Sequence, residues 1–303
     1  MKFSVKPAVL FAALPTLMLC GTNAHAEVFG SVGLDLSSHK NSGQNLNYAG
    51  AVDEPPTHNA LNFVGSFGYM MESGLELGIE AQIGRTNNKD TFNGQPTDDG
   101  VAAYNQIVGH LGYHFDQVYI GLHTGQALAF FTEEEKDQNA AFSLNGAGVG
   151  WSGDALRAGL SYSKMNFLAA DDEEMLHDAD FWNLRFSGDV SDRIVLHANL
   201  TSGKGTLDYL DTSPTPVDVE GGGIALSYMD DGQALGRPIE YTLGYEQYKY
   251  VEKHLDGRID DLIHARIYFG ISIPLGAGSQ PSSSAIAGPQ NLAWIQSSIA
   301  MID

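Results

Sequence analysis

Histidines have the widest chemical range of any residue type in this chain, because imidazole can ligate a metal ion, transfer a proton or carry charge near neutral pH. Five of them fall on the polar side of alternating polar and apolar segments: His110, His114, His123, His197 and His264. On a β-strand, His110 and His114 would lie about 13 Å apart, too far to share one metal ion. We therefore predict no metal site and no cofactor. We expect these histidines to hydrogen-bond beside tyrosines such as Tyr119. The alternative is a two-histidine metal site that His123, on the neighbouring strand, would complete.

Carboxylates and guanidinium groups follow the same alternation. The candidate charges are three acids from early segments, two arginines from the middle of the chain and one arginine near its end: Asp35, Glu76, Glu80, Arg157, Arg185 and Arg266. In a ring of twelve strands, strands six apart face each other, so the acids and the two central arginines would line opposite walls of a narrow aqueous pore. The alternative is a filled interior in which neighbouring charges form ion pairs. Arg266, near the junction of the first and last strands, fits either the pore or the filled interior.

Nucleophilic catalysis needs a hydroxyl within hydrogen-bond reach of a base, which on one strand face favours His-x-Ser. The sequence has no such triplet, and His197-Ala198-Asn199 has the spacing without a hydroxyl. The only cysteine, Cys20, falls in an expected leader, so the mature chain has neither a thiolate nor a disulfide. We predict that the protein is not an enzyme. A lipid hydrolase of the phospholipase or lipid A deacylase type, with serine and histidine from different strands, is the alternative.

The elements that position these residues are predicted to be β-strands, because apolar residues recur at every second position. The clearest segment runs from Leu75 to Ile83, where five apolar residues alternate with two carboxylates, a glycine and a glutamine. Twelve such segments are expected, near 27–36, 59–71, 74–85, 103–115, 117–126, 144–152, 155–164, 181–190, 193–202, 220–229, 238–249 and 261–275.

The connections between these segments alternate in length. Those at 37–58, 86–102, 127–143, 165–180, 203–219 and 250–260 are long and polar, whereas Glu72-Ser73, Asp116, Gly153-Asp154 and Ser191-Asp192 mark tight turns. Asp230 to Arg237 is an intermediate turn. This rhythm predicts an all-β fold, a single closed antiparallel transmembrane β-barrel over 27–275. Bacterial barrels place short turns in the periplasm, so both termini are expected there.

The first 26 residues have the features of a secretory signal peptide. Lys2 and Lys6 precede an apolar stretch, and Ala24-His25-Ala26 supplies the small residues of a cleavage site. A lipoprotein signal ending at Cys20 is the alternative. The net charge is −21, and the loss of two lysines with the leader makes it −23. Such a charge argues against nucleic acid as a partner.

Aromatic residues and the last strand indicate the environment of the barrel. Outward-facing aromatics gather near the tight turns, as expected for a girdle at a membrane interface, and Trp182 is expected at the opposite rim: Tyr69, Tyr113, Phe115, Trp151, Tyr228, Tyr241 and Trp182. Tyr268, Gly270, Ile273 and Leu275 have the spacing of an assembly signal that resembles the one ending Gram-negative outer-membrane proteins. The chain departs from that pattern, because Leu275 replaces a terminal aromatic and more residues follow. Residues 276–303 are expected to form a periplasmic tail, with a short helix near 291–301 or a plug that enters the lumen.

By overall pattern, residues 27–275 resemble the porin-like barrels of Gram-negative outer membranes. The resemblance implies an outer-membrane channel for passive diffusion of small hydrophilic solutes or ions. It also implies contact with outer-membrane lipid, lipopolysaccharide and the assembly machinery. The acidic loops and mixed lumen charges predict weak cation selectivity. A structural or adhesive barrel is a further alternative, because acidic loop runs such as Glu133-Glu134-Glu135 could bind divalent cations.

Overall fold

The computed structural model describes residues 27–44, 57–87, 91–92, 95–96, 103–133, 136–170, 175–208, 215–232, 236–253, 257 and 259–276. The expected leader and the tail beyond Gly276 lie outside these residues. The wall consists of twelve strands: β1 (Glu27–Gln44), β2 (Thr57–Met70), β3 (Leu75–Asn87), β6 (Ala103–Phe115), β7 (Val118–Glu133), β8 (Lys136–Ser152), β9 (Leu156–Ala170), β10 (Met175–Ser191), β11 (Ile194–Asp208), β12 (Thr215–Met229), β13 (Glu240–Lys253) and β14 (Ile259–Leu275).

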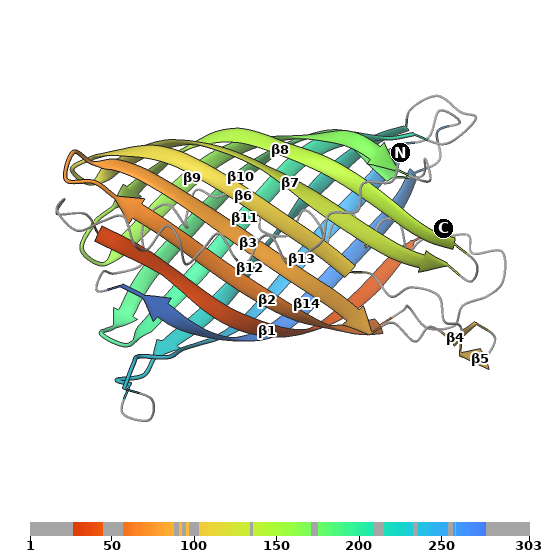
Figure 1. Cartoon of the computed structure of the whole chain (residues 1–303). Helices are drawn as coiled ribbons and strands as arrows, with labels where there is room; N and C mark the ends of the chain where they lie inside the picture. Colours follow the sequence, from red (N-terminus) through yellow and green to blue (C-terminus); the bar gives the residue numbers. More distant parts are fainter. Residues whose placement is uncertain are drawn as a thin grey trace.

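These strands close into one antiparallel barrel, in which strands adjacent in the sequence pair and β1 pairs with β14 (Figure 1). The all-β closed barrel of twelve strands is therefore confirmed. Following paired residues once around the wall from Gly30 leads to Gln44, 14 residues further along β1. That stagger corresponds to a strand tilt of about 40° and a backbone radius of about 12 Å.

The two faces of the wall differ in chemistry, because successive side chains of a strand point to opposite sides. On β1, Leu34 is 44% exposed and Leu36 is 58% exposed, whereas Asp35, Ser37 and His39 between and beyond them are buried. Large aliphatic and aromatic side chains are exposed on the outer face of every strand of the barrel. The outer face is thus apolar, and the inner face carries the polar groups.

The tight turns gather at one end of the barrel, here called the turn end, and the longer connections at the other, the loop end. Asp116 adopts a positive φ of 56° as the first residue of the two-residue turn Asp116–Gln117 between β6 and β7, a conformation typical of tight hairpins. In the intermediate turn, Asp230 Oδ1 accepts hydrogen bonds from the backbone N–H groups of Gly232 and Ile239 at 2.8 and 3.0 Å. The four predicted tight turns and this intermediate turn are confirmed.

The strands extend further toward the loop end than the sequence predicts. The expected connection at 127–143 is wrong for the most part, because β7 runs to Glu133 and β8 begins at Lys136. Two short strands that were not predicted, β4 (Thr91–Phe92) and β5 (Gln95–Pro96), pair in the connection between β3 and β6. In β7, residues 127–131 are Ala-Leu-Ala-Phe-Phe, apolar at successive positions, so the alternation of polar and apolar residues that marks a strand is lost before the strand ends. No helix long and apolar enough to span a membrane occurs among the described residues.

Exposed aromatic side chains gather at the turn end, as predicted. Phe115, Trp151 and Tyr228 stand within the last two residues of their strands, and each is at least 41% exposed. Trp182 is exposed as well, but it does not stand at the loop-end terminus of its strand. Strand β10 begins at Met175, which puts Trp182 well inside the strand, in ring contact with Tyr162 at 5.1 Å.

Candidate functional site: the inner wall of the barrel

Rings on the inner wall lie against glycines of neighbouring strands. A Cβ added to Gly84 would overlap the ring of Tyr104, and one added to Gly203 would overlap Phe181. The same relation holds for five further pairs: Gly78 with His110, Gly112 with Tyr119, Gly146 with His123, Gly221 with Tyr248 and Gly244 with Tyr268. A ring that lies against the wall projects less far toward the barrel axis than one that stands upright. These glycines therefore widen the interior.

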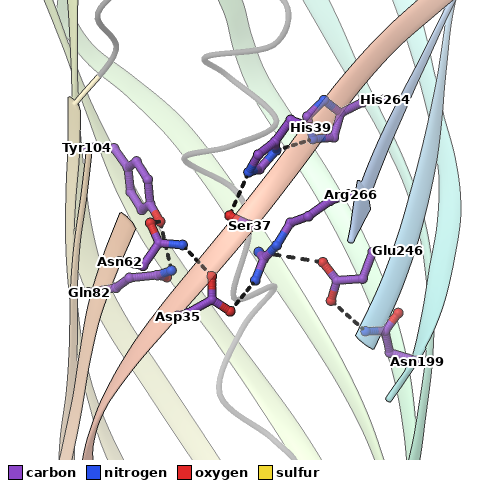
Figure 2. A network of polar contacts seen from close by, with 10 residues as sticks. All are labelled: Asp35, Ser37, His39, Asn62, Gln82, Tyr104, Asn199, Glu246, His264 and Arg266. Atoms are coloured by element: carbon purple, nitrogen blue, oxygen red, sulfur yellow. Dashed lines mark hydrogen bonds and ion pairs between the residues drawn. The ribbon is translucent and has the colours of Figure 1, made fainter. Parts of the chain in front are cut away.

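A polar network occupies the wall where the first and last strands meet (Figure 2). Arg266 of β14 donates from Nη2 to Asp35 Oδ2 of β1 at 3.0 Å, and its Nη1 lies 3.7 Å from Glu246 Oε2 of β13. Asn62 of β2 donates from Nδ2 to Asp35 Oδ1 at 2.7 Å. All four side chains are buried. Buried charges persist when they are paired and hydrogen-bonded, so loss of one member of this network would leave its partner uncompensated at the seam where β1 meets β14.

The network continues on both sides of the seam. On β6, the Tyr104 hydroxyl donates to Asn62 Oδ1 at 2.7 Å and accepts from Gln82 Nε2 at 2.8 Å. Toward the loop end, His39 Nδ1 lies 3.1 Å from His264 Nε2, and His39 Nε2 lies 2.8 Å from Ser37 Oγ. The sequence prediction missed His39, because it ended the first strand at residue 36. Extending the alternation of Asp35 and Ser37 by two residues would have found it.

Glu76 forms a second cluster near the turn end. Its Oε1 lies 3.0 Å from His110 Nε2 and its Oε2 lies 2.6 Å from His114 Nε2. The Tyr119 ring meets the His114 ring edge-on at 4.8 Å between centroids. The carboxylate, completely buried, thus binds the two histidines that the sequence places too far apart for one metal ion. Within the described ranges, no group of three or more His, Cys, Asp or Glu side chains is arranged to hold a metal.

The remaining predicted charges also have partners. Arg157 Nη2 of β9 lies 2.5 Å from Asp189 Oδ1 of β10. Arg185 of β10 interacts electrostatically with Glu80 of β3, which stands nearly opposite it in the ring. The three predicted acids come from the opposite side of the barrel to Arg157 and Arg185. Their charges are nevertheless compensated, either by a neighbouring side chain or by a group across the interior. The geometry favours ion pairs over two uncompensated walls.

The other inward histidines pair with serines. His197 lies 2.9 Å from Ser187 Oγ through Nδ1 and 3.2 Å from Ser227 Oγ through Nε2, and His123 Nε2 lies 2.9 Å from Ser163 Oγ. In each case the serine hydroxyl lies within hydrogen-bond distance of the histidine, as a nucleophile and its base must. His197, however, uses both ring nitrogens on hydroxyls, so no carboxylate orients it as a catalytic triad requires. His110 and His123 are paired directly across β6 and β7.

The expected assembly signal coincides with the end of the last strand, because β14 stops at Leu275. Tyr268 faces inward, with its ring against Gly244 and the Arg266 guanidinium 4.4 Å from its centroid. Two residues on, Gly270 keeps the inward parity. Ile273 and Leu275 have the outward parity of the apolar face.

No protein-family model matches the chain, and no curated protein matches it. Among solved structures, the translocator domain of the autotransporter NalP from Neisseria meningitidis matches with a TM-score of 0.43 at 12% identity, over 87% of this chain and 93% of that one. A Pseudomonas aeruginosa FadL homologue matches with a TM-score of 0.42 at 11% identity, over 82% and 90%. The monoaromatic hydrocarbon channel CymD matches with a TM-score of 0.42 at 12% identity, over 92% and 95%. Similarity at this level carries no argument about function.

Proposed function

We propose that the protein is an outer-membrane β-barrel channel through which small hydrophilic solutes and ions diffuse passively. The observation that carries the proposal is the division of the wall into two faces. A closed barrel with an apolar outer face satisfies every backbone group within lipid. The inner face carries the polar and charged groups beside buried apolar side chains such as Leu144 and Met165, and several of its rings lie against glycines. Passive diffusion across an outer membrane requires a barrel that contacts lipid with its outer face and offers a polar path inside.

The apolar belt supports a membrane of ordinary thickness. On β14, apolar side chains face outward at every second position from Ile263 to Leu275. At the rise and tilt of these strands, that span is about 30 Å tall, close to the apolar band of about 25 Å in outer-membrane barrels. We place the turn end in the periplasm, which leaves the longer connections outside, near lipopolysaccharide. The outward lysines Lys164 and Lys204, near the upper edge of the belt, suit contact with lipid headgroups.

The balance of inward charge supports a weak preference for cations. On the described wall, inward carboxylates outnumber inward guanidinium groups: Asp35, Glu76, Glu80, Asp189, Glu240, Glu246 and Glu252 stand against Arg157, Arg185 and Arg266. An excess of fixed negative charge raises the local concentration of cations. The ion pairs cancel much of this field, so the preference is modest.

Planar-bilayer recordings under a salt gradient test the proposal. The reversal potential of the unmodified protein should show a weak cation preference, which Glu80→Gln should reduce and Arg185→Gln should increase. Lys249→Gln, a change on the outer face, is the control and should leave the reversal potential unchanged. Clear anion preference would contradict the charge argument. An electrically silent protein with lipid-hydrolase activity would favour the enzyme, and a silent protein without it would favour a structural barrel.

A further inference from the structure

One side of the inner wall carries a group of buried polar atoms that have no hydrogen-bond partner among the described residues. They are His123 Nδ1 of β7, Ser161 Oγ of β9, Asn183 Oδ1 of β10 and Asn199 Oδ1 of β11. The side chains of His123, Ser161 and Asn183 are more than nine-tenths buried. Buried polar groups in folded proteins are nearly always hydrogen-bonded. Four such atoms together indicate that their partner is not part of the described wall.

The four residues are neighbours. Ser161 and Asn183 are directly paired across β9 and β10, which puts their Cβ atoms about 5 Å apart. Asn199 pairs with Arg185, two residues along β10 from Asn183, and is therefore its diagonal neighbour at about 7 Å. His123 reaches the same strand through its hydrogen bond to Ser163. The patch is about as large as one small molecule.

The chemistry of this patch selects for a neutral partner. Its members are two amides, a hydroxyl and an imidazole nitrogen, which offer both donors and acceptors without a fixed charge of their own. Arg185, which pairs with Asn199 on the same face, is offset by the carboxylate of Glu80. On the loop side, Phe181 stands two residues from Asn183 on the same face of β10, with its ring against Gly203. Val219 is paired with Gly203 and is buried beside it. Phe181 and Val219 are both fully buried, so on this side the hydrogen-bonding array borders packed apolar side chains.

We propose that Ser161, Asn183, Asn199 and His123 form a binding site for the transported solute, a small neutral molecule with several hydroxyl groups, such as a monosaccharide in its ring form. Hydroxyl groups serve as donors and acceptors at once and so match a mixed array of amides, a hydroxyl and an imidazole. The inference rests on the proposed channel function and deepens it, because a site in the path selects among the solutes that enter.

The test is the current through single barrels in planar bilayers as glucose is added to both sides, with the zwitterion betaine as the comparison solute. Glucose should reduce the current saturably in the unmodified protein, and betaine should not. Asn183→Leu should raise the half-saturating glucose concentration by about three- to tenfold, as expected for the loss of one hydrogen bond. Asn145→Leu is the matched control, because Asn145 is exposed on the outer face and bonds to Thr124, and it should leave the titration unchanged.

Binding is measured separately, by the glucose dependence of the urea midpoint of unfolding. A midpoint that rises with glucose in the unmodified protein and not in Asn183→Leu supports the site even if the barrel carries no current, in which case only the channel function fails. A normal current, with equal and linear effects of glucose and betaine and no shift in the midpoint, overturns the site and leaves the channel function standing. The polar atoms would then be satisfied by water alone.

Discussion

The two arginine–aspartate pairs of the inner wall should differ sharply in their contribution to stability. The side chains of Arg266 and Asp35 are 8% and 11% exposed, and Arg266 also faces Glu246. Arg266→Met would remove the cation that is bonded to the buried carboxylate of Asp35 and faces Glu246. Breaking a buried pair in this way costs about 3–5 kcal/mol, because the remaining charge stays desolvated.

The pair near the turn end provides the matched control. Arg157 is 21% exposed and its partner Asp189 is 38% exposed, so water can solvate the carboxylate when the arginine is removed. Arg157→Met should therefore cost about 0–1 kcal/mol. Replacing Asp35 by Asn and Glu246 by Gln in the Arg266→Met background should recover much of the loss, because no buried charge is then left without a partner.

The assay is urea unfolding of the barrel in lipid vesicles, followed by the fluorescence of Trp151 and Trp182 on the outer face. The expected result is a large fall in the midpoint for Arg266→Met, a small one for Arg157→Met and a partial recovery in the triple variant. Equal losses for the two single variants would refute the reasoning, since they would show that burial at the seam does not decide the strength of the pair.

Three further predictions concern the lumen, the tail and the orientation. Gly203→Ala should displace the Phe181 ring from the wall and lower the single-channel conductance, whereas Gly65→Ala, with open space at its Cβ, should not; equal conductance in both would show that the ring does not limit the lumen. Deleting 277–303 should leave folding and conductance intact if the tail is a periplasmic appendage, and a rise in conductance would identify it as a plug. A cysteine at Asp154, in a turn we place in the periplasm, should resist an impermeant maleimide on intact cells, and labelling there would invert the topology.

The sequence predicts the strands well, because their outer faces must be apolar at every second position. The alternation from Leu75 to Ile83 is enough to define one strand and to turn Glu76 and Glu80 inward. It fails toward the loop end, where the residues of β7 beyond 126 are strand although the sequence predicts a loop. Residues 127–131 are apolar at successive positions, so the two-residue period that identifies a strand is absent although backbone pairing continues.

The partners of the inward charges are harder to predict. Asp35 and Arg266 are 231 positions apart in the chain, and their pairing follows only once β1 is known to close on β14 in a particular register. The contact of Phe181 with Gly203 has the same origin, because a glycine in the sequence does not show which ring covers it. Parity places a side chain on the inner face, whereas register decides which other side chain it meets.

The most direct test of the channel function is the swelling of proteoliposomes in isotonic solutions of neutral solutes of increasing size. If the barrel provides a polar path for small solutes, vesicles that contain the protein should swell in glycerol and glucose, more slowly as the solute grows, while protein-free vesicles remain unchanged. Vesicles that carry correctly folded barrels but swell no faster than protein-free vesicles in any of these solutes would contradict passive diffusion through the lumen.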